Sequence, residues 1–179
     1  MPPMNELCRP KLFVSRVWEI DFAKLAELGI VNICCDIDNT LAERKAMEPM
    51  PEALQAINDA RSQGYIKKFC IVSNIIVGEH RRRRVQGFAK ALNTDFWYAA
   101  GFWDRKPKPA PFVAGMKMMG SAPQTTAMIG DQLFTDILGA NRLGMYSILV
   151  EPIGGDHWTT RLSGRRRREK EMLRLFGLK

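Results

Sequence analysis

Carboxylates, hydroxyls, amides and a lysine follow the apolar, strand-like segments of this 179-residue sequence. These residues are Asp36, Asp38, Asn39, Thr40, Ser73, Asn74, Lys106, Asp131 and Asp136. In an open parallel α/β sheet, ligands bind at the carboxyl ends of the strands. A carboxylate can attack phosphorus, a lysine can neutralise phosphate oxygens, and a divalent cation can hold the two anions together. The set therefore indicates phosphoryl transfer, with Mg²⁺ as the cation because it prefers oxygen ligands.

Five short segments are expected to form the strands that position these residues. Each is apolar almost throughout and contains β-branched residues, as expected of parallel strands covered on both faces. They are Val31–Ile37, Lys67–Val72, Phe96–Ala99, Thr126–Ile129 and Tyr146–Val150. Helix-like stretches alternate with them at Pro51–Gly64, Gly78–Leu92, Ala110–Gly120 and Leu133–Gly144. This alternation predicts an α/β fold with a doubly wound parallel sheet of about five strands.

The length and composition favour a single domain that is made and kept in the cytoplasm. Hydrophobic residues make up 46% of the sequence and charged residues 26%, as in ordinary globular proteins. No apolar run approaches the roughly 20 residues that span a bilayer, and the first ten residues do not resemble a secretory signal. The four cysteines, Cys8, Cys34, Cys35 and Cys70, form no C-x-x-C pair and are expected to be buried, reduced thiols.

The net charge of +8 is concentrated in two segments, His80–Lys90 and Thr159–Lys179. Such segments attract nucleic acid, anionic lipid or an anionic substrate, although a solvated helix face is the commoner explanation. Arg165–Arg168 and the apolar residues that follow predict a basic amphipathic helix, which can lie on an anionic membrane. We therefore divide the sequence into an N-terminal amphipathic segment (1–29), a core (30–155) and a basic C-terminal helix or tail (156–179).

The order of these residues resembles the four motifs of phosphatases in the haloacid dehalogenase (HAD) superfamily. Asp36-Ile37-Asp38-Asn39-Thr40-Leu41 is similar to the first motif, Ser73 to the second, Lys106 to the third, and Gly130-Asp131 with Asp136 to the fourth. The resemblance covers roughly residues 30 to 150 and implies the Rossmann-like HAD fold. The loop from Asp38 to Pro51 and the helix and strand between Ser73 and Lys106 leave no room for a cap domain.

The resemblance also implies a role for each residue. Asp36 would be the nucleophile and a magnesium ligand, and Asp38 the general acid/base, with its backbone carbonyl on the metal. Lys106 would neutralise charge, Asp131 and Asp136 would complete the metal site, and the substrate-binding residues would be Asn39, Thr40, Ser73 and Asn74. Turn or helix-cap chemistry is the alternative explanation of Asp36 and Asp38. Lys108 is the alternative to Lys106 as the lysine of the third motif.

A closer resemblance links residues 130–153 to the YqeG-type branch of HAD subclass IIIA. Relatives of this branch include phosphatidylglycerophosphate phosphatases. The resemblance therefore implies a lipid-borne phosphate monoester as substrate and a peripheral position on the inner membrane face. The second motif departs from the branch, because Ile75 follows Ser73-Asn74 where a second asparagine is usual.

Two other functions remain open. One is the same chemistry on a soluble or macromolecular phosphate ester. The other is a nucleic-acid-binding protein on a HAD scaffold, for instance near ribosomes, whose arginine runs contact phosphates. The complete catalytic set disfavours the second. For residues 1–29, packing on the sheet is favoured over membrane contact.

Overall fold

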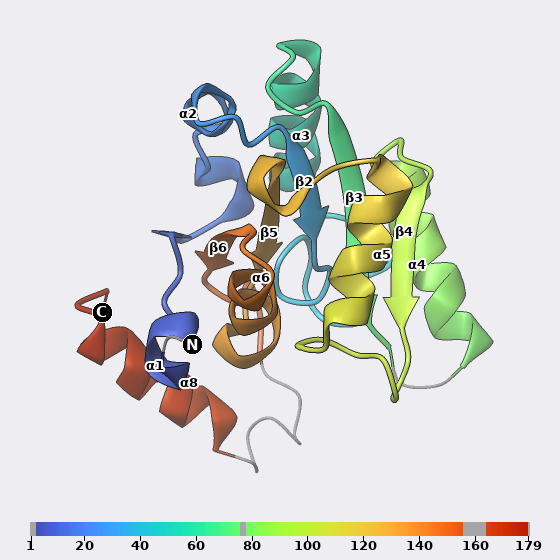
Figure 1. Ribbon diagram of the computed structural model, residues 1–179. Coiled ribbons are helices and arrows are strands. Elements are labelled where there is room, and N and C mark those ends of the chain that lie inside the picture. Colours follow the sequence, from blue (N-terminus) through green and yellow to red (C-terminus); the bar gives the residue numbers. More distant parts are fainter. Residues whose placement is uncertain (1–2, 76–77, 156–163, 179) are drawn as a thin grey trace.

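A parallel β-sheet forms the centre of the computed structural model, which describes residues 3–75, 78–155 and 164–178 (Figure 1). Within these residues the sheet has six strands in the order β1-β6-β5-β2-β3-β4, and all neighbours are parallel. The strands are β1 (Leu12–Val14), β2 (Asn32–Cys35), β3 (Lys68–Asn74), β4 (Phe96–Ala100), β5 (Thr126–Gly130) and β6 (Tyr146–Val150). The predicted α/β class with a parallel sheet is confirmed.

Helices connect the strands and cover the sheet. They are α1 (Met4–Leu7), η1 (Val17–Glu19), α2 (Phe22–Glu27), α3 (Pro51–Ser62), α4 (Glu79–Ala91), α5 (Pro109–Met119), η2 (Pro123–Thr125), the π-helix η3 (Leu133–Ile137), α6 (Leu138–Arg142) and α8 (Arg165–Leu175). Proline at the first turn of α3 and α5 suits the helix start, where a backbone N–H has no partner within the helix. No cap domain is inserted among the described residues of 39–50 or 74–105.

Successive strand residues enter hydrophobic cores on opposite faces of the sheet. Ile33 and Cys35 of β2 pack in a core with buried residues of α2, α3 and α4. Cys34, between them, packs in a second core with Phe112 of α5 and Ala140 of α6. This alternation follows from the two-residue period of a strand and gives the doubly wound arrangement. The four cysteines are buried and free, as predicted.

The N-terminal segment contributes the sixth strand, which the helical spacing of its apolar residues did not indicate. Leu12–Val14 pair with Ile148–Val150 of β6, and the Lys11 amide donates to the Ser147 carbonyl at 3.0 Å. Without this strand, the edge of β6 would leave backbone N–H and C=O groups without partners, and pairing with Leu12–Val14 gives these groups hydrogen bonds. After this strand the apolar residues lie in two helices, η1 and α2.

The C-terminal helix α8 packs on the sheet end through Leu173, which shares a small core with Leu133, Ile137 and Leu149. Residues 156–163 of the predicted basic segment lie outside the described part of the chain. No helix among the described residues is long and apolar enough to cross a membrane.

Candidate active site

A tight turn after β2 carries the first two aspartates. The Asp36 amide donates to the Ile129 carbonyl at 3.0 Å, so the residue extends the pairing with β5 beyond β2 itself. Asn39 then takes a left-handed conformation (φ 62°), which asparagine tolerates better than most residues. Its amide donates to the Ala42 carbonyl at 2.8 Å. The structure thus places Asn39, a predicted substrate-binding residue, inside the turn, where it is 2% exposed.

The end of β5 and the π-helix that follows bring Asp131 and Asp136 to the same edge of the sheet. Gly130 permits this approach, because a Cβ atom there would lie 2.4 Å from the Asp136 side chain. The Asp136 Oδ2 accepts hydrogen bonds from the Gln132 amide at 3.1 Å and from the Thr135 hydroxyl at 3.3 Å. A π-helix widens the turn and often occurs at functional sites.

Asp36, Asp131 and Asp136 form an acidic cluster in which each residue offers a carboxylate oxygen within 4.8 Å of the others. All three residues are buried, and Asp131 Oδ1 has no hydrogen-bond partner among the described residues. Burial raises the pKa of Asp131 to about 8, against the opposing effect of Arg166 and with a further contribution from the two neighbouring carboxylates. A cluster of buried oxygens with one unpaired ligand atom fits a divalent cation.

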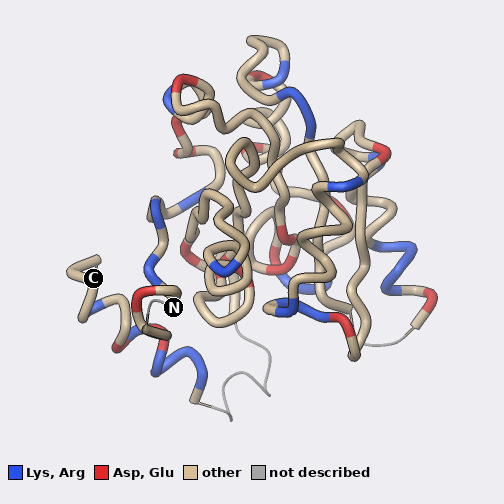
Figure 2. Tube along the Cα trace, in the orientation of Figure 1, with Lys and Arg blue, Asp and Glu red and all other residues tan. Residues whose placement is uncertain are grey.

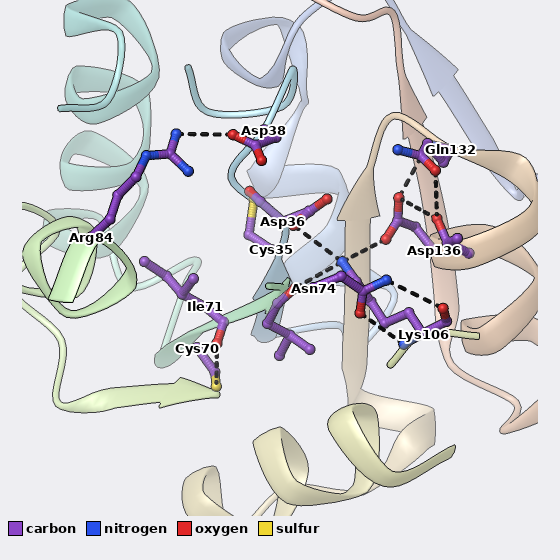
Figure 3. A network of polar contacts seen from close by, with 12 residues as sticks. Cys35, Asp36, Asp38, Cys70, Ile71, Asn74, Arg84, Lys106, Gln132 and Asp136 are labelled. Carbon is purple, nitrogen blue, oxygen red and sulfur yellow. Dashed lines mark hydrogen bonds and ion pairs between the residues drawn. The ribbon is translucent and has the colours of Figure 1, made fainter. Parts of the chain in front are cut away.

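Lys106 lies against this cluster and neutralises part of its charge (Figure 3). Its Nζ is 2.7 Å from Asp136 Oδ1 and 3.2 Å from Asp36 Oδ1, and it donates to the Val72 carbonyl at 2.8 Å. Burial favours the neutral amine, but Asp136 and Asp36 outweigh it and raise the Lys106 pKa above its ordinary value. Lys106 therefore stays charged. Lys108, the alternative lysine, lies outside the cluster and donates to the Trp103 carbonyl.

Asn74 holds the backbone of Lys106. The Lys106 amide donates to Asn74 Oδ1 at 2.8 Å, and Asn74 Nδ2 donates to the Lys106 carbonyl at 3.2 Å (Figure 3). This pair joins the end of β3 to the loop that carries the lysine. The two predicted hydroxyl residues, Thr40 and Ser73, are buried at the same edge, and Thr40 Oγ1 has no partner among the described residues.

Asp38 lies outside the acidic cluster, in an ion pair with Arg84 of α4. Asp38 Oδ1 is 2.9 Å from the Arg84 guanidinium, whose Nε donates to the Ala46 carbonyl at 2.7 Å. In the sequence, Arg84 is the last of four consecutive arginines and was not predicted as a site residue. The Arg84 guanidinium carbon lies 5.0 Å from the centre of the Phe88 ring. The spacing of four residues from a buried apolar residue does not single out Arg84, because Arg81 has the same spacing from the buried Val85.

The C-terminal helix reaches the acidic cluster, which the sequence analysis missed. Arg166 forms an ion pair with Asp131 Oδ2, donates to the Asp131 carbonyl at 2.7 Å and contacts Glu169 at 2.9 Å. Glu169 is 3% exposed and accepts a hydrogen bond from the Phe134 amide at 3.4 Å. Burial raises the Glu169 pKa, and Arg166 opposes that shift. The spacing of Arg166, Glu169 and Leu173 places all three on one helix face, but no spacing within the helix indicates which part of the protein that face contacts.

A parallel sheet whose carboxyl edge gathers three aspartates and a buried lysine defines a hydrolase of the HAD type. The HAD-hydrolase-like family model matches residues 103–164. The Bacillus subtilis (strain 168) protein named "Probable phosphatase YqeG" is 34% identical over 155 residues, which cover 86% of this chain and 84% of that protein. The chain belongs to the HAD family of phosphatases.

Two further comparisons agree with this family but are more distant. A glyceraldehyde 3-phosphate phosphatase of Methanothermobacter thermautotrophicus is 28% identical over 109 residues, 58% of this chain and 45% of that protein. The match thus spans less than half of the archaeal enzyme. The crystal structure of an uncharacterized protein from Listeria monocytogenes serotype 4b superposes with a TM-score of 0.56 at 20% identity, covering 72% of this chain and 84% of that one. This likeness concerns the fold.

Proposed function

We propose that this phosphatase is a Mg²⁺-dependent phosphomonoesterase that works through an aspartyl-phosphate on Asp36. The observation that carries the proposal is the buried cluster of Asp36, Asp131 and Asp136 with Lys106 against it. The three carboxylates would hold the cation, with the Asp38 backbone carbonyl as a fourth ligand. When bound, Mg²⁺ would neutralise the repulsion between the nucleophile and the phosphate.

The protein's own residues supply the remaining chemistry. The Asp36 carboxylate attacks phosphorus and displaces the leaving oxygen, which takes its proton from Asp38. Asp38 then accepts a proton from the water that hydrolyses the aspartyl-phosphate. Lys106 stays charged throughout and neutralises Asp36 and the phosphate oxygens. Because the Asp38 carboxylate is paired with Arg84, it must leave this ion pair, take up a proton from solvent and turn toward the substrate before it can act as the acid.

Four side chains complete the proposed site around the phosphate. The Thr40 and Ser73 hydroxyls hold phosphate oxygens. The buried Thr40 Oγ1, which has no hydrogen-bond partner in the described part of the chain, supports this role. Asn39 shapes the turn that follows Asp36 and Asp38, and Asn74 positions Lys106 through its backbone. Both asparagines therefore act on the substrate through the residues that they hold.

We infer that the substrate is phosphatidylglycerophosphate and the product phosphatidylglycerol. The resemblance of residues 130–153 to the YqeG-type branch of subclass IIIA supports this substrate class. The described residues contain no cap domain over the site, which leaves room for a phosphate that projects from a lipid surface. The basic segments on α4 and α8 suit an anionic surface and a peripheral position on the inner membrane face.

A small soluble phosphate ester is the second candidate substrate. It is favoured by the archaeal relatives that are named glyceraldehyde 3-phosphate phosphatases, at 28% and 24% identity. A nucleic-acid-binding role on a HAD scaffold has less support, because such a role does not require the acidic cluster or the buried lysine.

The test is phosphate release from phosphatidylglycerophosphate in mixed micelles, from glyceraldehyde 3-phosphate and from an aryl phosphate, each with Mg²⁺ and with EDTA. Asp36→Asn should reduce release to background, whereas the exposed Asp59→Asn of α3 serves as the matched control and should behave as the parent protein. Preference for the lipid would support the proposed substrate, and preference for glyceraldehyde 3-phosphate would support the second candidate. Folded protein that releases phosphate from none of the three would contradict the proposed chemistry.

A further inference from the structure

The loop between β4 and α5, which also carries Lys106 of the candidate active site, exposes two adjacent aromatic side chains. Phe102 is 59% exposed and Trp103 is 81% exposed, although both are large apolar residues. Their rings meet edge to face at 5.3 Å. Among the exposed large apolar residues of the described chain, they alone are neighbours that share a ring contact. An exposed aromatic pair of this kind marks a contact surface rather than part of the core.

The same loop is held in place and flanked by cations. Lys108 Nζ donates to the Trp103 carbonyl at 2.6 Å, and the Arg105 guanidinium lies 5.0 Å from the centre of the Phe102 ring. Asp104, the acidic residue of the loop, accepts a hydrogen bond from the Tyr98 hydroxyl at 2.5 Å. The aromatic rings are therefore presented by an ordered loop whose outward charges are mainly positive.

This aromatic loop, residues 101–108, shares the carboxyl edge of the sheet with the other basic segments. It follows β4 and contains Lys106 of the acidic cluster, α4 begins just beyond the end of β3, and α8 contacts Asp131 beyond the end of β5. Figure 2 shows Lys and Arg on the loop, on α4 and on α8. Apolar rings with cations around them, on the loop that also carries Lys106, match the chemistry of an anionic lipid surface.

We propose that the aromatic loop inserts Phe102 and Trp103 into an anionic lipid surface, with Arg105 and Lys108 at the level of the headgroup phosphates. The inference rests on the proposed function, because that surface would carry the phosphate that Asp36 attacks. Docking through this loop would place the headgroup layer at the opening of the site, because Lys106 of the acidic cluster follows Trp103 by three residues. Nucleic acid fits the loop less well, because Arg105 already lies over the Phe102 ring and the edge-to-face pair offers no flat platform for bases.

Vesicle flotation tests the docking apart from the chemistry if the full chain carries Asp36→Asn. This protein should bind phosphatidylcholine vesicles that contain phosphatidylglycerol more strongly than vesicles of phosphatidylcholine alone. Adding Phe102→Ser and Trp103→Ser should weaken binding to the anionic vesicles at least about tenfold. The matched control is Leu28→Ser, which removes a side chain that is 58% exposed just before β2, at the opposite edge of the sheet. It should bind as strongly as its parent.

A second measurement reports on insertion itself. Brominated acyl chains should quench the tryptophan fluorescence of the Asp36→Asn parent, and Trp103→Phe should remove most of this quenching while its circular dichroism spectrum stays that of the parent. Equal binding by the parent and the double-serine variant would overturn the inference. So would loop-dependent binding of single-stranded RNA without binding to vesicles, which would assign the surface to nucleic acid. Phosphate release is measured separately with the protein that keeps Asp36. This second result distinguishes a failure of docking from a failure of the proposed function.

Discussion

Replacing Arg166 with methionine is expected to lower the free energy of unfolding by about 3–5 kcal/mol in the absence of divalent cations. The Arg166 side chain is 14% exposed, and its carboxylate partners are 0% (Asp131) and 4% (Glu169) exposed. The substitution leaves two buried carboxylates without their cation, while methionine keeps much of the apolar volume. The expected cost is that of breaking a buried ion pair and applies above pH 8, where Asp131 is ionised, because its pKa is about 8.

The assay is urea denaturation followed by circular dichroism, with EDTA and with Mg²⁺. Mg²⁺ should recover part of the loss, because a cation held by Asp131 restores positive charge beside that carboxylate. The matched control is Arg167→Met on the same helix, whose ion pair with Glu171 is largely exposed and is expected to contribute little. If Arg166→Met costs no more than Arg167→Met, then the contact with Asp131 does not hold α8 on the protein and our reasoning is refuted.

Three further predictions concern the cluster and the core. Lys106→Met should lower the rate of aryl phosphate hydrolysis by about 100- to 1,000-fold, because the charge between Asp36 and the phosphate is lost; a rate near that of the parent would contradict the proposed role. Gly130→Ala should displace Asp136, lower stability by about 1–3 kcal/mol and weaken Mg²⁺ binding in calorimetry, whereas unchanged binding would show that the close approach is not required. In the folded protein, a thiol reagent at pH 8 should modify none of the four buried cysteines. One reason is that the hydrogen bond with Cys34 and burial raise the pKa of Cys70. Rapid labelling without unfolding would contradict this packing.

The sequence was sufficient to predict five of the six described strands and all three aspartates of the acidic cluster, because both depend on local patterns. Short apolar segments that alternate with helices predict parallel strands, and the carboxyl ends of parallel strands share one edge. Asp36, Asp131, Asp136 and Lys106 therefore had to come close together even though up to 100 positions separate them along the chain.

The features that were not predicted depend on contacts between distant residues. Leu12–Val14 form a strand only because the edge of β6 is available, and three residues carry too little pattern to indicate it. The contact of Arg166 with Asp131 depends on how α8 docks, which no local spacing determines. The pairing of Asp38 with Arg84 likewise depends on the packing of α4 against the loop after β2.

The pairing of β1 with β6 has a consequence for the order in which the chain can fold during synthesis. Residues 12–14 leave the ribosome long before residues 146–150, with a delay of roughly 10 s at typical rates of translation. The central strands β2, β3 and β5 can assemble in the meantime, because their partners lie closer along the chain. Arg166 is synthesised later still. A nascent chain could therefore hold an assembled sheet in which Asp131 is not yet paired with the Arg166 guanidinium.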